Sequence, residues 1–399
     1  MRGPTLHVAA LPFPSWQGTQ AVLARMLAAS ADDGRETHLL CYAHGHGTAP
    51  RGVHVHRIAD LPRVRSMRSG PSAAKLVLDA SLAASLWALA RELQPELIVA
   101  HHVEAAAVAA ALPIGPVLFF AHTDLGAELP AYGPAALAEP LRMAGRALDR
   151  TLIAGSDAVA TISPLLAERL AARVAGAMEW VRYVPAPWGD GSAGAGTRTR
   201  TRTDAAVVLY TGNLDAYQGL PLLLEALSMV REPVTLVVGT PDDPAPLQRA
   251  ADAAGVRERV RVEALHTEEQ RAALHAEADV AVIPRTVPGG LPIKLLDALA
   301  RGLPPVVTRA AAGGLALPDA IFMAEAGPLG LARAIEDAVT ARDLELRAMR
   351  ARAYVQRAHT PERYLAALDR QAELARRRHR GRVPALRAPR RWATLAPWR

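Results

Sequence analysis

The 399-residue sequence contains one cysteine, Cys41, and only two lysines among its 46 basic residues. A single cysteine excludes a disulfide within the chain and favours a reducing compartment. Long apolar runs are also lacking. The longest, from Ala105 to Ala121, is interrupted by Pro113, Gly115 and Pro116. It therefore predicts a helix followed by a buried strand rather than a membrane span, and we expect a cytoplasmic protein.

Several catalytic signatures are absent from the sequence. There is no Gly-x-Ser-x-Gly elbow for a nucleophilic serine, no phosphate loop ending in Gly-Lys-Ser/Thr, and no Gly-x-Gly-x-x-Gly opening a first helix. No Asp-x-Asp sequence occurs either. Adjacent His101 and His102, followed by Glu104, are weak metal ligands, because neighbouring side chains of a strand point to opposite faces. We expect no metal site and no bound cofactor.

Half of the residues are apolar and 21% are charged, which is typical of a globular protein. A chain of this length predicts two or more domains. The net charge of +7 arises at one end, because residues 376–399 hold nine arginines and no acid. Removing these nine charges from +7 leaves −2 for the rest of the chain. The body is slightly acidic and the basicity lies in a tail.

Apolar strand candidates alternate with segments of helical period in both halves, which predicts parallel α/β units. Strands are expected at residues 5–11, 37–42, 97–101, 117–121, 158–162, 180–184, 206–211, 234–239, 260–263, 280–284 and 305–308. Helices are expected at 19–30, 73–93, 220–230, 246–254, 267–276 and 291–301. After Ile321 we expect a helical chain that ends in a long helix from Pro361 to about Arg380.

A small, polar stretch, residues 191–204, lacks any apolar period and predicts a flexible linker. It separates an N-terminal domain, residues 1–190, from a second domain, residues 205–355. A C-terminal helix over 356–380 and a basic tail over 381–399 follow. Two similar α/β domains form a cleft, and ligands of open parallel sheets bind beyond the carboxyl ends of the strands.

One of the two lysines, Lys294, lies near the start of an apolar helix. A cation at that end is unfavourable by roughly 0.3–1 kcal/mol, an objection that a bound anion would remove. Gly289 and Gly290 precede the helix and allow a ligand to approach the backbone, while free N–H groups favour an anion. Lys294, Asp297 and Arg301 form one polar stripe, suited to a phosphate and a ribose diol. A solvated stripe held by Lys–Asp and Asp–Arg pairs is the alternative.

A second candidate loop follows the strand expected at 206–211. Gly212 and Gly219 flank the polar residues Asn213 and Gln218, and an apolar helix follows. Many turns between a strand and a helix have this composition, so the pattern alone is a weak signal.

In their order along the chain, these segments resemble the donor domain of family 4 glycosyltransferases, which have the two-domain GT-B fold. The matching segments over residues 205–310 are Tyr-Thr-Gly-Asn-Leu, Gln-Gly, Leu-Leu-Leu-Glu-Ala, Arg-Val-Arg-Val, Ala-Asp-Val-Ala-Val-Ile-Pro, Gly-Leu-Pro-Ile-Lys-Leu-Leu-Asp-Ala-Leu-Ala-Arg-Gly and Pro-Pro-Val-Val. The N-terminal half matches more loosely, at residues 12–19, 119–124 and 157–164.

The resemblance implies an α/β fold of the GT-B type, in which two Rossmann-like parallel domains face across a cleft and a C-terminal helix returns to the N-terminal domain. It also implies an enzyme that transfers a sugar from a nucleotide-diphosphate sugar to a glycan, lipid-linked or small-molecule acceptor. The transfer would retain the stereochemistry of the sugar and need neither a metal nor a cofactor.

Residue roles are implied as well. His122 matches a histidine that faces the cleft and contacts the transferred sugar, and we assign it as the catalytic residue; a histidine capping a strand end is the alternative. The donor-binding residues would be Gly212, Asn213, Gln218, Arg285, Gly289, Gly290, Lys294 and Asp297. The residues on the acceptor side would be Trp16, Gln17, Gly18 and Asp124.

The sequence departs from the family pattern at three positions. The arginine and lysine usual in the first loop are Asn213 and Gln218, and the first of two glutamates around the second loop is Gly289. A charge-assisted hydrogen bond is worth about 1.5–3 kcal/mol, so two lost cations matter to a diphosphate site. We expect Lys294, with Arg285 nearby, to compensate. A catalytically weak relative that binds a sugar or a partner, or a nucleotide-sugar epimerase of the same fold, is the alternative.

The arginine-rich tail is open to three interpretations. Its arginines alternate with Leu386, Trp392, Leu395 and Trp398, a composition that suits attachment to the anionic inner face of a membrane, where lipid-linked acceptors would be met. A disordered, solvated tail is an equal alternative. Nucleic acid is the weakest candidate, because only charge supports it.

Overall fold

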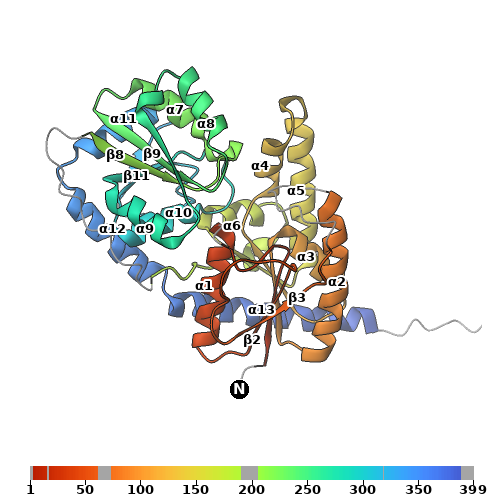
Figure 1. Cartoon of the computed structure of the whole chain (residues 1–399). Helices are drawn as coiled ribbons and strands as arrows, with labels where there is room; N and C mark the ends of the chain where they lie inside the picture. Colours follow the sequence, from red (N-terminus) through yellow and green to blue (C-terminus); the bar gives the residue numbers. More distant parts are fainter. Residues whose placement is uncertain (1–2, 16–17, 62–72, 190–204, 318, 388–399) are drawn as a thin grey trace, which may run out of the picture.

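The protein is described by a computed structural model over residues 3–15, 18–61, 73–189, 205–317 and 319–387. These residues form two α/β domains, each built on one parallel sheet (Figure 1). Trp16, Gln17, the predicted linker and the last twelve residues of the tail, 388–399, lie outside the described residues.

The N-terminal domain has a seven-stranded sheet in the order β3-β2-β1-β4-β5-β6-β7. Its central strands are buried on both faces, which is why they are continuous apolar runs. The strands are β1 (Thr5–Ala9), β2 (Thr37–Cys41), β3 (Val53–Arg57), β4 (Leu97–His101), β5 (Val117–Ala121), β6 (Ala158–Thr161) and β7 (Val181–Tyr183). The helices are α1 (Gly18–Asp32), α2 (Ala73–Leu93), α3 (His102–Ala110), α4 (Leu125–Glu128), α5 (Ala138–Gly155) and α6 (Pro164–Ala171).

The C-terminal domain has a six-stranded sheet in the order β10-β9-β8-β11-β12-β13. The strands are β8 (Ala206–Thr211), β9 (Val234–Thr240), β10 (Val260–Ala264), β11 (Val280–Ile283), β12 (Pro305–Thr308) and β13 (Phe322–Ala324). The helices are α7 (Leu220–Met229), α8 (Ala245–Ala253), α9 (Glu268–Glu277), α10 (Ile293–Arg301), α11 (Pro328–Thr340) and α12 (Leu344–Ala358). Short 3-10 helices are η1 (Leu129–Tyr132), η2 (Ala135–Leu137), η3 (Ala177–Glu179), η4 (Ala216–Gln218) and η5 (Arg257–Arg259).

The sequence analysis missed two strands, β3 and β13. The edge strand β3 is only half-buried and reads Val-His-Val-His-Arg, so it lacks the apolar run that marks the central strands. The expectation that the chain is helical after Ile321 is wrong, because β13 pairs with β12 before α11 begins. A three-residue strand is too short for a periodic signal.

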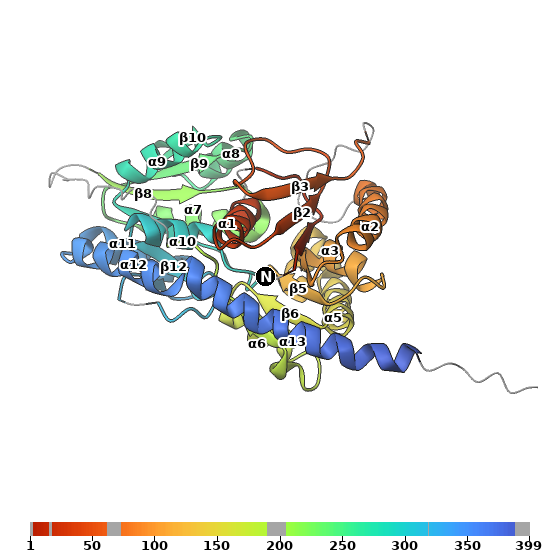
Figure 2. The same cartoon turned by 90° about the horizontal axis from the view of Figure 1, so that it is seen from below.

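The long helix α13 (Pro361–Arg387) runs along the N-terminal domain although it follows the C-terminal one (Figure 2). Several polar contacts hold it there. Arg35 Nη1 lies 2.7 Å from Asp369 Oδ1, and His379 Nδ1 lies 3.1 Å from Asp157 Oδ2. No helix within the described ranges is long and apolar enough to cross a membrane.

The two domains also meet directly through α10. Leu291, Leu295 and Leu299 belong to the same buried apolar cluster as the central strands of the N-terminal sheet. A backbone hydrogen bond of 3.1 Å from Leu165 N to Gly313 O joins the domains nearby. The helix therefore buries its apolar face between the domains.

Candidate active site

Two loops meet at the middle of the C-terminal sheet. The neighbouring strands β8 and β11 are parallel, so the first loop, residues 212–219, and the second loop, residues 284–292, leave the sheet at the same edge. The strand order reverses at this point, which is where open α/β sheets bind ligands. Gly219 has φ +78°, and a Cβ there would overlap the carbonyl of Pro284. Only glycine therefore allows the two loops to pack together.

The polar residues predicted in the first loop bind one another. Gln218 Nε2 donates to Asn213 Oδ1 at 2.6 Å, and Asn213 Nδ2 donates to Asp215 Oδ2 at 2.5 Å. Tyr210 Oη donates to the Asn213 carbonyl at 2.6 Å. The two amides that stand in place of the family's cations thus fix the shape of the loop, and they bring no positive charge to it.

Positive charge reaches the first loop from α10. Lys294 Nζ donates to Gln218 Oε1 at 3.1 Å and lies 3.8 Å from the centroid of the Tyr210 ring. A Cβ on Gly212 would lie 2.9 Å from the same nitrogen. In the described chain no carboxylate forms an ion pair with Lys294. Burial, together with the nearby charge of Arg285 and Arg271, lowers the pKa of Lys294 well below its ordinary value.

A charged ammonium group in this position is energetically unfavourable unless an anion pairs with it, because a buried charge loses its hydration. The structure therefore places Lys294 against the first loop without a counter-ion, and a bound phosphate would supply one.

Asp297 lies one turn further along α10 and pairs within the C-terminal domain. Its Oδ1 accepts from Arg301 Nε at 3.2 Å, and its Oδ2 lies 3.6 Å from His275 Nε2. Arg301 also pairs with Glu268. The alternative interpretation of this stripe expected Lys–Asp and Asp–Arg pairs. The structure contains the Asp297–Arg301 pair. No hydrogen-bond partner for the buried Asp297 Oδ2 exists in the described part of the chain.

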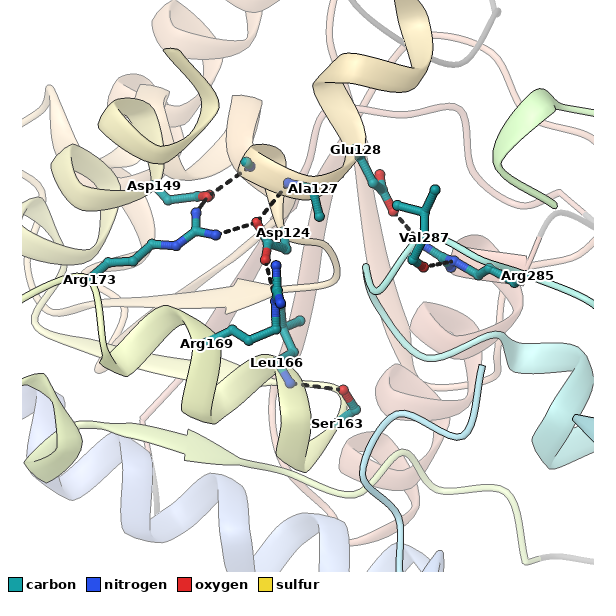
Figure 3. Close-up of polar contacts among 11 residues, drawn as sticks. Asp124, Ala127, Glu128, Asp149, Ser163, Leu166, Arg169, Arg173, Arg285 and Val287 are labelled. Carbon is teal, nitrogen blue, oxygen red and sulfur yellow. Dashed lines mark hydrogen bonds and ion pairs between the residues drawn. The ribbon is translucent and has the colours of Figure 1, made fainter. Parts of the chain in front are cut away.

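Arg285 is already paired across the cleft. Its Nη2 donates to Glu128 Oε1 at 2.5 Å, and its Nε donates to the Val287 carbonyl at 3.0 Å (Figure 3). The sequence analysis offered Arg285 as a second cation for the donor, whereas here a carboxylate of the N-terminal domain neutralises it. Glu128 was not among the predicted site residues, because nothing local links it to a loop 157 positions later in the chain.

His122 lies directly opposite the second loop. A Cβ on Gly290 would overlap the His122 carbonyl, so only glycine permits this approach of the two domains. At the start of α1, Gly18 lies beside α10, where a Cβ would be 3.6 Å from Ile293 Cβ. The structure thus brings His122 and Gly18 of the N-terminal domain next to Gly290 and α10, the helix that carries Lys294. It does not do the same for every predicted residue.

The acceptor-side prediction for Asp124 does not agree with the structure. This side chain is fully buried, caps α4 by accepting from Ala127 N at 3.0 Å, and pairs with Arg169 at 2.7 Å and Arg173 at 2.6 Å (Figure 3). Arg173 also pairs with Asp149 of α5. Because both carboxylate oxygens are used within the N-terminal domain, Asp124 fixes the segment between β5 and α5 rather than a ligand.

A row of three buried histidines leads from the N-terminal sheet to the cleft. His7 Nδ1 of β1 lies 2.9 Å from His101 Nε2, and His101 Nδ1 lies 3.1 Å from His122 Nε2. Burial lowers the pKa of His7 to about 3 and lowers the pKa values of His101 and His122 well below 6.5. All three rings are therefore neutral at neutral pH.

Each neutral ring carries one N–H, so the row has two fully bonded arrangements. His7 Nε2 has no partner in the described chain. An unpaired buried N–H is rarer in proteins than an unpaired acceptor, which favours the arrangement with the His7 proton on Nδ1. The donors then point along the row from His7 to His122. We expect His122 to accept from His101 at Nε2 and to carry its own proton on Nδ1. A ligand would meet this Nδ1–H.

The neutral histidines predict a loss of stability in acid. A ring whose folded pKa lies below its unfolded value stabilises the protein fully above about pH 6.5 and loses that contribution as the pH falls. The loss is about 1.4 kcal/mol per pH unit for each such ring. We expect His7→Leu to lower the slope of unfolding free energy against pH by up to one proton below about pH 6 and to leave the slope unchanged above about pH 7. Chemical denaturation between about pH 5 and pH 8 measures the slope.

The control is Leu76→Ala in α2, an exposed apolar side chain that binds no proton in either state and should leave the slope unchanged. A slope equal to that of the unsubstituted protein in His7→Leu would show that the His7 ring is charged in the fold.

Among the described residues, no group of three His, Cys, Asp or Glu side chains is arranged to hold a metal ion. His102, which the sequence analysis weighed as a ligand, instead stacks on His122 with ring centroids 4.5 Å apart.

Comparison with known proteins covers both domains. The family described as "Glycosyl transferase 4-like domain" matches residues 17–187, and the family described as "Glycosyl transferases group 1" matches residues 205–341. No curated protein matches the sequence.

Solved structures share the fold at low identity. Sucrose-phosphate synthase from Thermosynechococcus elongatus has a TM-score of 0.77 at 16% identity, covering 94% of this chain and 100% of that chain. Anabaena HepE, in complex with UDP and glucose, has a TM-score of 0.68 at 16% identity, covering 93% and 100%. WaaG, a glycosyltransferase involved in lipopolysaccharide biosynthesis, has a TM-score of 0.65 at 17% identity, covering 90% and 97%.

The two parallel sheets, the two loops that meet beside Lys294, and the two family matches agree with one another. The chain belongs to the group 1, family 4-like glycosyltransferases and is an enzyme of the GT-B fold.

Proposed function

We propose that this glycosyltransferase takes its sugar from a nucleoside diphosphate sugar, whose diphosphate binds at Lys294. The observation that carries the proposal is the ammonium group itself, held against Gln218 and Gly212 with no carboxylate paired to it within the described residues. A diphosphate leaving group develops negative charge as the bond to the sugar breaks. A fixed cation and free N–H groups beside it stabilise that charge.

The remaining parts of the donor fit the neighbouring groups. Asp297, whose buried Oδ2 lacks a hydrogen-bond partner in the described chain, is our proposed acceptor for a ribose hydroxyl. His122 faces the second loop from the other domain and would contact the sugar. Structures of HepE contain UDP and UDP-glucose, which supports the same class of donor here. The donor-binding set predicted from the sequence thus remains our proposal, with Arg285 acting through Glu128.

The acceptor is proposed to be a hydroxyl of a glycan, a lipid-linked molecule or a small molecule, approaching from the N-terminal domain. The acceptor oxygen forms a bond to the anomeric carbon, the bond from that carbon to the diphosphate oxygen breaks, and the acceptor proton passes to the released nucleoside diphosphate or to water. Retention of stereochemistry and independence from metal ions are part of the proposal, the latter supported by the missing Asp-x-Asp sequence. So is attachment of the arginine-rich tail to an anionic membrane surface.

A thermal-shift panel tests the proposal. UDP, GDP, ADP, dTDP and CMP are each added to the full chain, and a ligand at 100 times its dissociation constant is expected to add about 2.7 kcal/mol of stability. One nucleoside diphosphate should raise the unfolding temperature clearly, and the corresponding sugar nucleotides are then assayed for transfer with and without acceptors. No shift with any of the five would refute a donor site and favour a relative that binds a sugar or a partner. Conversion of the sugar nucleotide without an acceptor would indicate an epimerase.

A further inference from the structure

We infer that Glu128, a residue of the N-terminal domain, supplies the carboxylate that binds hydroxyls of the transferred sugar above the second loop. The inference rests on the proposed function, since it names how the same site recognises the sugar. Its ground is the position of this side chain, which comes from one domain and lies over a glycine of the other.

The carboxylate occupies the space that a side chain at position 289 would need. A Cβ on Gly289 would overlap both Glu128 Oε1 and Arg285 Nη2, and would lie 3.2 Å from Glu128 Cδ. Gly289 is not among the glycines with positive φ, so its backbone conformation suits any residue. Glycine is needed there because Glu128 reaches across the cleft to the second loop. The second loop has glycine instead of glutamate at position 289, and Glu128 of the N-terminal domain places a carboxylate beside that position.

Glu128 is held in place and is partly free to bind. It is the last residue of α4, whose first turn is fixed by the buried Asp124 cap (Figure 3). Its side chain is 15% exposed. Oε1 accepts from Arg285, and no hydrogen bond joins Oε2 to any other described residue. A carboxylate with one oxygen fixed and one oxygen open is arranged to accept from hydroxyl groups.

The surrounding residues place Glu128 on the sugar side of the phosphates. The Arg285 guanidinium lies 5.1 Å from the centroid of the Tyr217 ring, and Tyr217 precedes Gln218, which binds Lys294. A chain of contacts thus runs from Lys294 through Gln218, its neighbour Tyr217 and Arg285 to Glu128. A sugar attached to a diphosphate at Lys294 would extend toward Glu128 and the nearby His122.

A competing explanation gives Glu128 a structural role only, in which its ion pair with Arg285 holds the domains together. The two explanations differ in what they expect of the sugar. A domain contact affects a nucleoside diphosphate and its sugar conjugate alike, whereas a sugar contact affects only the conjugate.

The test compares Glu128→Gln with the unsubstituted protein by calorimetric binding. The probes are UDP and UDP-glucose if UDP gives the thermal shift, and otherwise the stabilising nucleoside diphosphate with its glucose and mannose conjugates. We expect Glu128→Gln to bind the nucleoside diphosphate within about two-fold of normal while its affinity for the conjugate and its kcat/KM fall about ten-fold or more, the range for a hydrogen bond to a charged group. Glu139→Gln on the surface of α5 is the matched control and should change neither.

A relocated carboxylate provides a second test. In Glu128→Ala with Gly289→Asp, the flexible end of Arg285 must shift because the new Cβ would overlap its Nη2. The new aspartate would then carry its oxygens near the place that Glu128 Oε1 vacates. We expect the double variant to recover binding of the conjugate that Glu128→Ala loses. Equal losses for both probes in Glu128→Gln, or no loss at all, would overturn the inference while the proposed function stands. If the unsubstituted protein binds no sugar nucleotide, the proposed function itself fails and the inference fails with it.

Discussion

Replacing Lys294 with methionine should weaken nucleoside diphosphate binding by on the order of 100-fold, since a charge-assisted hydrogen bond contributes about 1.5–3 kcal/mol. The unfolding temperature should stay the same or rise. Burial lowers the pKa of Lys294 because its ammonium is poorly solvated in the free protein, and methionine removes that cost while keeping most of the apolar stem. Calorimetric titration and thermal unfolding of the same variant measure the two effects.

The chain offers a matched control in its other lysine. Lys75 pairs with Glu104 at 3.3 Å in the N-terminal domain, away from both loops. Lys75→Met makes the same chemical change and should leave the dissociation constant of the nucleoside diphosphate unaltered. Similar weakening in both variants, or normal affinity in Lys294→Met, would rule out Lys294 as the phosphate ligand. A large fall in unfolding temperature for Lys294→Met would show that the lysine stabilises the free protein instead.

The largest effect on stability is expected for Asp124→Ala. This carboxylate is buried between Arg169 and Arg173, and removing one partner of a buried ion pair leaves charge uncompensated at a cost of about 3–5 kcal/mol. The unfolding temperature should fall by on the order of 10 °C, as seen by calorimetry. Since Asp124 holds α4, the variant should also bind the sugar conjugate less well through misplacement of Glu128.

Glu139→Ala on α5 is the control for this change. Glu139 pairs with Arg142 on the surface, where an ion pair contributes about 1 kcal/mol or less. If Asp124→Ala destabilised the protein no more than Glu139→Ala, the buried network around Arg173 would not carry the stability that the structure assigns to it.

Local patterns in the sequence were sufficient to predict the positions of most strands. β4, β5, β8 and β12 begin and end at the predicted residues because each is a mostly apolar run bounded by polar or turn residues. The helix α10 and the glycines before it were also predicted from local patterns, namely an apolar helical period and the Gly-Gly pair. Two edge strands were missed, β3 because it is only half-buried and lacks an apolar run, and β13 because it has only three residues.

The sequence by itself determined the two parallel α/β domains, the loops beside the cleft, and the presence of a lysine where a helix start disfavours one. Those features depend on periodicity and backbone freedom, which act over a few residues. Tertiary structure alone decided which side chains meet. Lys294 and Gln218 are 76 positions apart, and Arg285 and Glu128 are 157 apart. Their contacts depend on strand order and on how one domain lies against the other, and a local pattern carries neither.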